Sequence, residues 1–159
     1  MLKVKQEIER KFVVDSRNIP DLSQATRKEI RQFYTKIDGE SEERIRSVGD
    51  KYFRTLKVGK GLVREETENE ITREEFERER SSRKGIIIEK TRFVVMHAGH
   101  KIELDVYAGA LRGLVVAEVE FNSKNAAQEF KPPAWFSAEV TENTLYSNRN
   151  LALSGANPS

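Results

Sequence analysis

Pairs of like charge, separated by a single residue, recur along this sequence. The pairs are Arg44 and Arg46, Lys90 and Arg92, Glu103 and Asp105, and Glu118 and Glu120. On a β-strand, side chains two positions apart point to the same face, so the members of each pair repel one another unless an opposite charge lies between them. A hard divalent cation relieves paired carboxylates, and phosphate relieves paired bases. The pairs therefore predict a site for a phosphate chain that carries a metal ion.

The first strand-like segment mixes both signs of charge on one face. Glu7, Glu9 and Lys11 share one parity, while Ile8 and Phe12 share the other. In an ordinary antiparallel sheet the charged face meets water and the apolar face meets the core, and for any single strand this is the simpler interpretation. The recurrence of pairs of one sign in strand after strand instead favours a barrel whose interior is charged.

Eight segments show the period-2 pattern of strands. They cover residues 3–14, 29–37, 42–48, 51–58, 62–71, 85–95, 101–107 and 113–122. Short turns join most of them, which favours antiparallel pairing, and eight strands suffice to close a barrel with room for a small ligand. We therefore predict an α+β fold that is mainly β: an eight-stranded antiparallel closed tunnel barrel with a charged lumen and a few flanking helices.

Helix signals are few and short. Residues 72–75 have the form of a capping box and open a charged helix that ends near Arg83. A second helix is expected over residues 123–130, before two prolines, and a third within residues 141–153. We expect one domain over residues 1–153 and a frayed tail over residues 154–159.

Composition excludes several classes of function. The chain of 159 residues holds 28 basic and 26 acidic residues, a formal charge of +2, and this balance argues against nucleic acid as the main partner. Cys is absent, which excludes disulfides and thiolate metal sites. No segment has the pattern of a signal peptide or membrane span, so we expect a cytoplasmic protein without a membrane partner. The apolar side chains of the strands are expected to point outward, and a few short helices cannot cover them all. We therefore also predict a homodimer that buries part of the outer wall.

The segment Glu7–Phe12 resembles the ExExK signature of the CYTH domain, the family of triphosphate tunnel metalloenzymes. The similarity continues through Arg44-Ile45-Arg46, Leu56-Lys57, Glu89-Lys90-Thr91-Arg92, Glu103-Leu104-Asp105-Val106 and Ala117-Glu118-Val119-Glu120-Phe121. It covers nearly the whole chain, and the ordered set is specific where ExExK alone is weak. Near the C-terminus, Tyr146-Ser147-Asn148 is similar to short bacterial members. In one departure, Phe33 stands where relatives usually have Gly.

The resemblance implies an enzyme that hydrolyses or rearranges triphosphates with Mg²⁺ or Mn²⁺. The positions that match the family's metal-associated acids are Glu7, Glu9, Asp105, Glu118 and Glu120. The positions that match its phosphate-binding bases are Lys11, Arg44, Arg46, Lys57, Lys90 and Arg92. Lys90 and Tyr34 also match a lysine and a tyrosine used near the attacked phosphorus, while Glu7 and Glu9 are expected to order the attacking water.

The function expected from these residues is metal-dependent hydrolysis of a small anionic substrate, a triphosphate, by in-line attack of water inside the tunnel. Inorganic tripolyphosphate is the first choice of substrate, with nucleoside triphosphates next. The sequence leaves open a class IV adenylate cyclase or a thiamine triphosphatase on the same fold. It also leaves open a non-catalytic module that binds polyphosphate or nucleotides.

Overall fold

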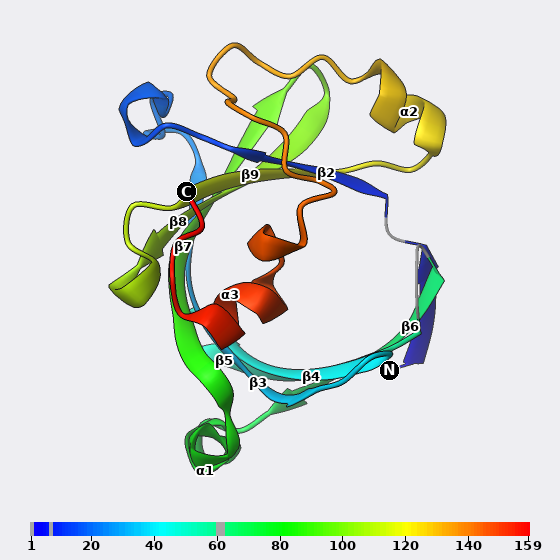
Figure 1. The fold of residues 1–159 in the computed structure, drawn as a ribbon, viewed down its shortest axis with the longest axis vertical. Coiled ribbons are helices and arrows are strands. Elements are labelled where there is room, and N and C mark those ends of the chain that lie inside the picture. The colour runs from blue at the N-terminus through cyan, green and yellow to red at the C-terminus, as the bar shows by residue number, and fades with distance from the viewer. Residues whose placement is uncertain (1, 7, 60–62) are drawn as a thin grey trace.

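One antiparallel sheet curls into a ring and forms most of the molecule (Figure 1). The computed structural model describes residues 2–6, 8–59 and 63–159, with the backbone alone at residues 2–6, 63 and 64. The strands are β1 Leu2–Gln6, β2 Glu9–Val13, β3 Thr26–Ile37, β4 Ser41–Val48, β5 Lys51–Val58, β6 Val63–Ile71, β7 Lys84–His97, β8 His100–Ala108 and β9 Val115–Glu120. Their order across the sheet is β1-β6-β5-β4-β3-β7-β8-β9-β2. The predicted eight-stranded antiparallel architecture is thus confirmed, with the first strand divided in two.

The division of that first strand corrects the prediction of a closed barrel. β1 pairs with β6, where Leu2 lies opposite Thr67, and β2 pairs with β9, where Glu9 lies opposite Glu120. Because the two segments have different neighbours, they stand at the two ends of the hydrogen-bonded order, and no ladder joins these described strands to one another. Figure 1 shows the sheet curling most of the way round between these two edge strands, which are consecutive along the chain.

The apolar face of the sheet points out of the ring, as expected. Phe12, Leu104 and Val119 are buried there, under Phe130 and Phe136, which follow the helix α2 (Lys124–Glu129). The rings of Phe12 and Phe136 lie 4.7 Å apart. The chain's own segments thus cover this part of the outer wall, and burial of these apolar side chains favours the curled sheet.

The helix α1 (Arg73–Glu79) covers another part of the outer wall, below the ring in Figure 1. Thr72 caps it through the predicted capping box with Glu75. Its buried Phe76 packs on Phe33, with ring centroids 5.3 Å apart, and on Ile45. Phe33, the residue that departs from the family pattern, therefore provides packing surface for this helix. None of the helices among the described residues is long and apolar enough to cross a membrane.

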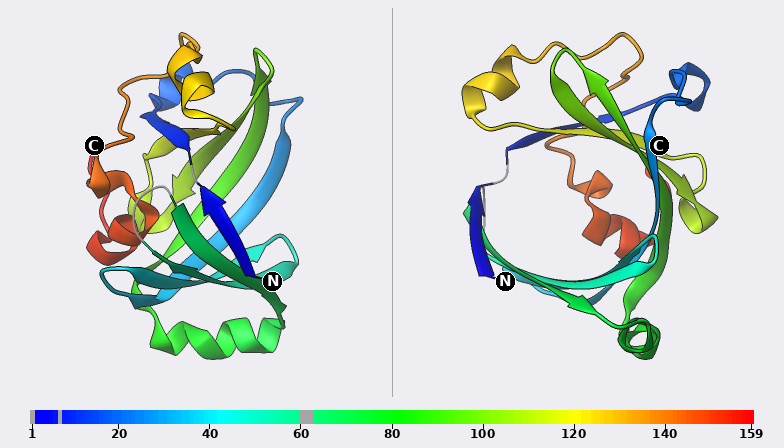
Figure 2. Two further views of the ribbon diagram at one scale, coloured as in Figure 1. Left: turned by 90° about the vertical axis from the view of Figure 1, so that its right-hand side faces the viewer. Right: turned by 180° about the vertical axis from the view of Figure 1, so that it is seen from behind.

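A short C-terminal helix, α3 (Asn148–Ser154), lies over one end of the ring (Figures 1 and 2). Leu151 and Ala152 are fully buried on its inner side. Gly85, at the start of β7, has a φ of +77° and lies against the carbonyl group of Ala152. A side chain at this glycine has no room, so the helix rests directly on the backbone of the barrel rim.

Replacing Gly85 by Ala should destabilise the protein by about 2 kcal/mol or more. The new Cβ would collide with the Ala152 carbonyl, and an L residue is strained at this φ. Gly99→Ala is the matched control, since Gly99 has a φ of +81° but no neighbour within 4 Å. Denaturant unfolding of both variants separates the two costs. Equal losses in the two variants would show that α3 does not depend on this contact.

Candidate active site

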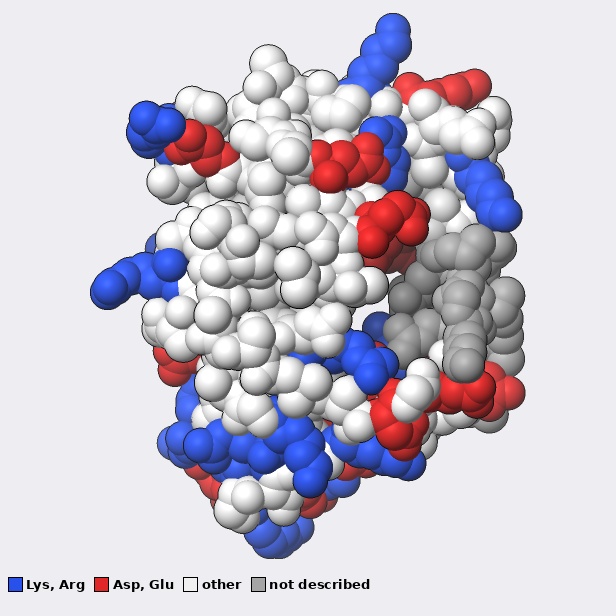
Figure 3. All heavy atoms as spheres, in the orientation of Figure 1, with Lys and Arg blue, Asp and Glu red and all other residues white. Residues whose placement is uncertain are grey.

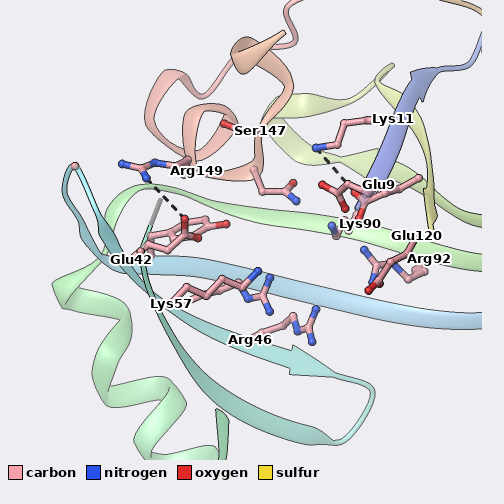
Figure 4. Close-up of a pocket in the computed structure, with 16 residues that line it drawn as sticks. Glu9, Lys11, Glu42, Arg46, Lys57, Lys90, Arg92, Glu120, Ser147 and Arg149 are labelled. Carbon is pink, nitrogen blue, oxygen red and sulfur yellow. Dashed lines mark ion pairs between the residues drawn. The ribbon is translucent and has the colours of Figure 1, made fainter. Parts of the chain in front are cut away.

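The charged face of the sheet lines a cavity of about 440 Å³ inside the ring (Figure 4). The lining residues are Glu9, Lys11, Tyr34, Gly39, Glu42, Arg44, Arg46, Lys57, Gly59, Lys90, Arg92, Glu118, Glu120, Ser147, Asn148 and Arg149. They include ten of the twelve side chains predicted from the sequence. Of the other two, Glu7 lies outside the described residues and Asp105 lies just behind the lining. Figure 3 shows a hollow beside the uncharged atoms that cover the ring, with basic and acidic side chains around it.

Basic side chains occupy the middle of the cavity. Arg44 and Arg46 extend from β4, opposite Tyr34 and Gln32 of β3. Burial, together with the positive charges of Arg44 and Arg92, lowers the pKa of Arg46 to about 10. Within the described part of the chain, the Nε atoms of Arg44 and Arg46 are buried without a hydrogen-bond partner. Crowded guanidinium groups with unused donors fit a ligand of high negative charge, such as a phosphate chain.

Carboxylates gather at one end of the cavity, where β2 and β9 run side by side. Glu9 lies opposite Glu120, and Lys11 lies opposite Glu118 with its Nζ 3.9 Å from Oε2. Although burial raises the pKa of Glu118, a hydrogen bond with Glu9 and the charge of Lys11 outweigh it and leave the pKa below its usual value. Carboxylate oxygens are the ligands that a hard divalent cation prefers.

The described residues do not by themselves form a complete cage for a metal ion. No group of three or more His, Cys, Asp or Glu side chains among them is arranged to hold one. Mg²⁺ commonly takes only one or two protein carboxylates, and waters and phosphate oxygens fill its remaining positions. One or two carboxylates at this end of the cavity would be enough for a metal ion that arrives with a phosphate chain.

Asp105 lies among cations. Its Oδ1 accepts a hydrogen bond from Nε of Arg92 at 2.8 Å, and its Oδ2 accepts one from Nη2 at 3.0 Å. The ammonium group of Lys90 is 2.8 Å from the same Oδ2. Burial raises the pKa of Asp105, but these two cations outweigh it and hold the pKa below its usual value. The sequence assigned this carboxylate to a metal ion, and the structure places it between two bases.

The side chains of Lys90 and Tyr34 line the cavity, and both residues are buried. The side chain of Lys90 is 1% exposed, and burial lowers its pKa to about 8 although Asp105 opposes this effect. Burial also raises the pKa of Tyr34 to about 12. At neutral pH the phenol is therefore a hydrogen-bond donor, whereas the lysine can lose its proton much more readily than an exposed one.

Sequence reasoning missed a group of side chains at the end of the cavity opposite the acids. Arg149 of α3 donates a hydrogen bond from Nη2 to the carbonyl oxygen of Asp38 at 2.9 Å, and its Nη1 is 3.8 Å from Oε1 of Glu42. Figure 4 shows this pair at the far side of the basic group from Glu9. Glu42 has the same parity as Arg44, so the strand pattern contained a signal for it. Helix residues such as Arg149 carry no such signal.

Comparisons with known proteins identify the family of this fold. The model of the CYTH domain matches residues 5–151. An inorganic triphosphatase of Nitrosomonas europaea is 45% identical over 150 residues, with 93% of this chain and 97% of the relative covered. An inorganic triphosphatase of Acetivibrio thermocellus is 36% identical over 149 residues, with 92% of each covered. A crystal structure of an inorganic triphosphatase superposes with a TM-score of 0.74 at 42% identity, covering 92% of this chain and 94% of the other. The chain belongs to the CYTH domain family.

Proposed function

We propose that this protein hydrolyses inorganic triphosphate with the help of a divalent metal ion, Mg²⁺ or Mn²⁺. The observation that carries the proposal is the division of one cavity into a basic middle and a carboxylate end. Two relatives that match almost the full chain are named inorganic triphosphatases. The CYTH family is generally metal-dependent, and the carboxylate end is where a cation fits.

The basic middle of the cavity binds the phosphate chain. The bases in question are Lys11, Arg44, Arg46, Lys57, Lys90 and Arg92. The guanidinium groups supply forked donors and the lysines supply compact charges, so together they neutralise and orient the phosphoryl oxygens. Although burial lowers the pKa of Arg92, its hydrogen bond and ion pair with Asp105 raise that pKa above its usual value. This base therefore keeps its charge throughout the reaction.

The carboxylate end positions the metal ion and the water that attacks. Glu9, Glu118 and Glu120 would hold the cation, which would draw negative charge from the phosphate oxygens when bound. The same glutamates orient a water molecule in line with the bond to the leaving phosphate. We place Glu7 with them from the sequence. Asp105 is assigned instead to the support of Lys90 and Arg92, because both of its oxygens contact those bases.

Lys90 and Tyr34 assist the chemical step. Lys90 in its neutral form accepts the proton that the attacking water loses, and its lowered pKa makes this form accessible near neutral pH. Tyr34, which stays protonated, donates a hydrogen bond to a phosphoryl oxygen. The products are then inorganic phosphate and pyrophosphate, with the oxygen of the water on the phosphate that is released.

The test is the release of phosphate from tripolyphosphate, ATP and thiamine triphosphate with and without Mg²⁺ or Mn²⁺. We expect release from tripolyphosphate to be fastest, and EDTA to abolish it. Appearance of cyclic AMP from ATP would assign the site to a cyclase instead. Tight binding of tripolyphosphate without any phosphate release would identify a non-catalytic binding module.

A further inference from the structure

Arg149 and Glu42 form a charged group at the end of the cavity that is remote from the carboxylates. Tyr34 and Arg44 lie beside them, and the charges of all three ionised residues act on the Tyr34 phenol. Glu42 is buried, with 8% of its surface exposed. A buried acid is unexpected at one end of a cavity built for anions, because it repels the ligand unless a cation offsets it. Arg149 is positioned to provide that offset.

The position of Arg149 is fixed from two sides. On one side, Leu151 and Ala152 anchor α3 in the core, and Gly85 lets the helix rest on the strand backbone. On the other side, the guanidinium group crosses to the hairpin between β3 and β4, where Asp38 accepts its hydrogen bond. That bond uses Nη2 and leaves Nη1 at 3.8 Å from Glu42, which is too long for a hydrogen bond. Arg149 therefore places a positive charge at a fixed position in the cavity wall, and its Nη1 makes no hydrogen bond to Glu42.

We propose that Arg149 binds the phosphate at the end of the substrate remote from the metal ion, and that Glu42 competes with this phosphate for Nη1. This inference rests on the proposed triphosphatase function and extends it to substrate selection. In tripolyphosphate the remote phosphate is a free chain end with up to two negative charges. In a nucleoside triphosphate attacked at its γ-phosphate, the remote group is the α-phosphate, which is esterified and carries one charge. A cation at this position therefore favours the inorganic substrate.

The two side chains should act in opposite directions. Arg149→Gln removes the cation, and we expect the KM for tripolyphosphate to rise by about tenfold or more, the effect of losing one charge-assisted hydrogen bond. The kcat should fall by less than KM rises, because Arg149 is remote from the carboxylates and Lys90 and affects the chemical step only through its neighbour Tyr34. Glu42→Gln removes the competitor, and we expect the KM for tripolyphosphate to fall. Steady-state kinetics with tripolyphosphate and ATP at saturating Mg²⁺ measures both.

Selection between substrates is the more specific readout. Arg149→Gln should reduce the ratio of kcat/KM for tripolyphosphate to that for ATP, and Arg149→Lys should restore part of it. Leu151→Ala is the control, since it loosens α3 in the core while Arg149 keeps its charge and its hydrogen bond to the carbonyl oxygen of Asp38. We expect Leu151→Ala to lower the melting temperature and to leave the substrate ratio unchanged.

Three results would overturn the assignment. They are an unchanged KM in Arg149→Gln, a rise of KM in Glu42→Gln equal to that in Arg149→Gln, and the same loss of substrate ratio in Leu151→Ala. The last two would show that the pair only fastens the helix. Failure of the wild-type protein to release phosphate from tripolyphosphate is a different result, because it contradicts the triphosphatase function itself.

Discussion

Asp105→Asn should lower the free energy of unfolding by about 3–5 kcal/mol, the cost of breaking a buried ion pair from one side. Arg92 would keep its charge next to a neutral amide, and Lys90 would lose the partner that opposes the lowering of its pKa by burial, in a site where Asp105 is 7% and Lys90 1% exposed. Part of this loss should return when tripolyphosphate is added, because the negative charge of the substrate replaces that of Asp105 and the substrate binds only the folded state. Denaturant unfolding with and without tripolyphosphate measures both effects.

Glu103→Gln is the control for this variant. Glu103 also pairs with Arg92, at 3.2 Å, but its side chain is 26% exposed, so its loss should cost about 1 kcal/mol or less. If Asp105→Asn kept the stability of the wild type but lost affinity for the metal ion, Asp105 would be a metal ligand after all. That outcome would restore the role that the sequence predicted for it.

Glu118→Gln should lower kcat/KM for tripolyphosphate by about 10²–10³-fold, the loss typical when a group that stabilises charge in the transition state is removed. The side chain is 25% exposed and its ion pair with Lys11 is 3.9 Å long, so the change should have little effect on folding. The variant should also need more Mg²⁺ to reach half of its own maximal rate. Titration of activity with Mg²⁺ separates this effect from a loss of substrate binding.

Glu129→Gln, which changes an exposed side chain of α2, is the matched control and should behave as the wild type. A Glu118→Gln protein with undiminished activity would remove this glutamate from the metal site. A protein that lost activity together with its melting transition would instead assign Glu118 to the fold.

The sequence predicted the sheet and most of the cavity because both follow from the alternation of side chains along strands. Lys11, Arg46 and Glu118 come from three different strands, and each has the parity opposite to the apolar residues of its strand, which assigns all three to the charged face. Parity does not show which charges meet. Asp105 has the expected parity, yet its partners depend on the register between β7 and β8, where it lies opposite Arg92. That register is a property of the folded sheet.

Two further differences between the predicted and the observed cavity also have local causes. The register between β3 and β4 shifts between Tyr34 and Lys36, so strict alternation fails on β3, whereas Glu42 on β4 keeps the parity of Arg44 and was missed although the pattern contained it. The helix α3 brings Arg149 to the cavity because it docks against Gly85, and no spacing in the sequence predicts this tertiary contact.

The outer wall of the barrel is better covered than the sequence suggested. The segment around Phe130 and Phe136 and the helix α1 bury much of the outward apolar face within one chain. Among the described residues, the large apolar side chains that stay exposed are Val58, Met96, Leu145 and Leu153. The homodimer stays a prediction, and the need to cover the outer wall is a weaker reason for it than it was from sequence alone.

The pairing of β2 with β9 has a consequence for the order in which the protein is made. Lys11 meets Glu118 across that pair, and Arg10 forms an ion pair with Glu139, 129 positions further along the chain. During synthesis on a ribosome, the N-terminal strand must wait for its partner until most of the polypeptide has emerged. Because contacts of such long range form slowly, catalytic competence should arise in the last step of folding, after β3–β8 have already assembled.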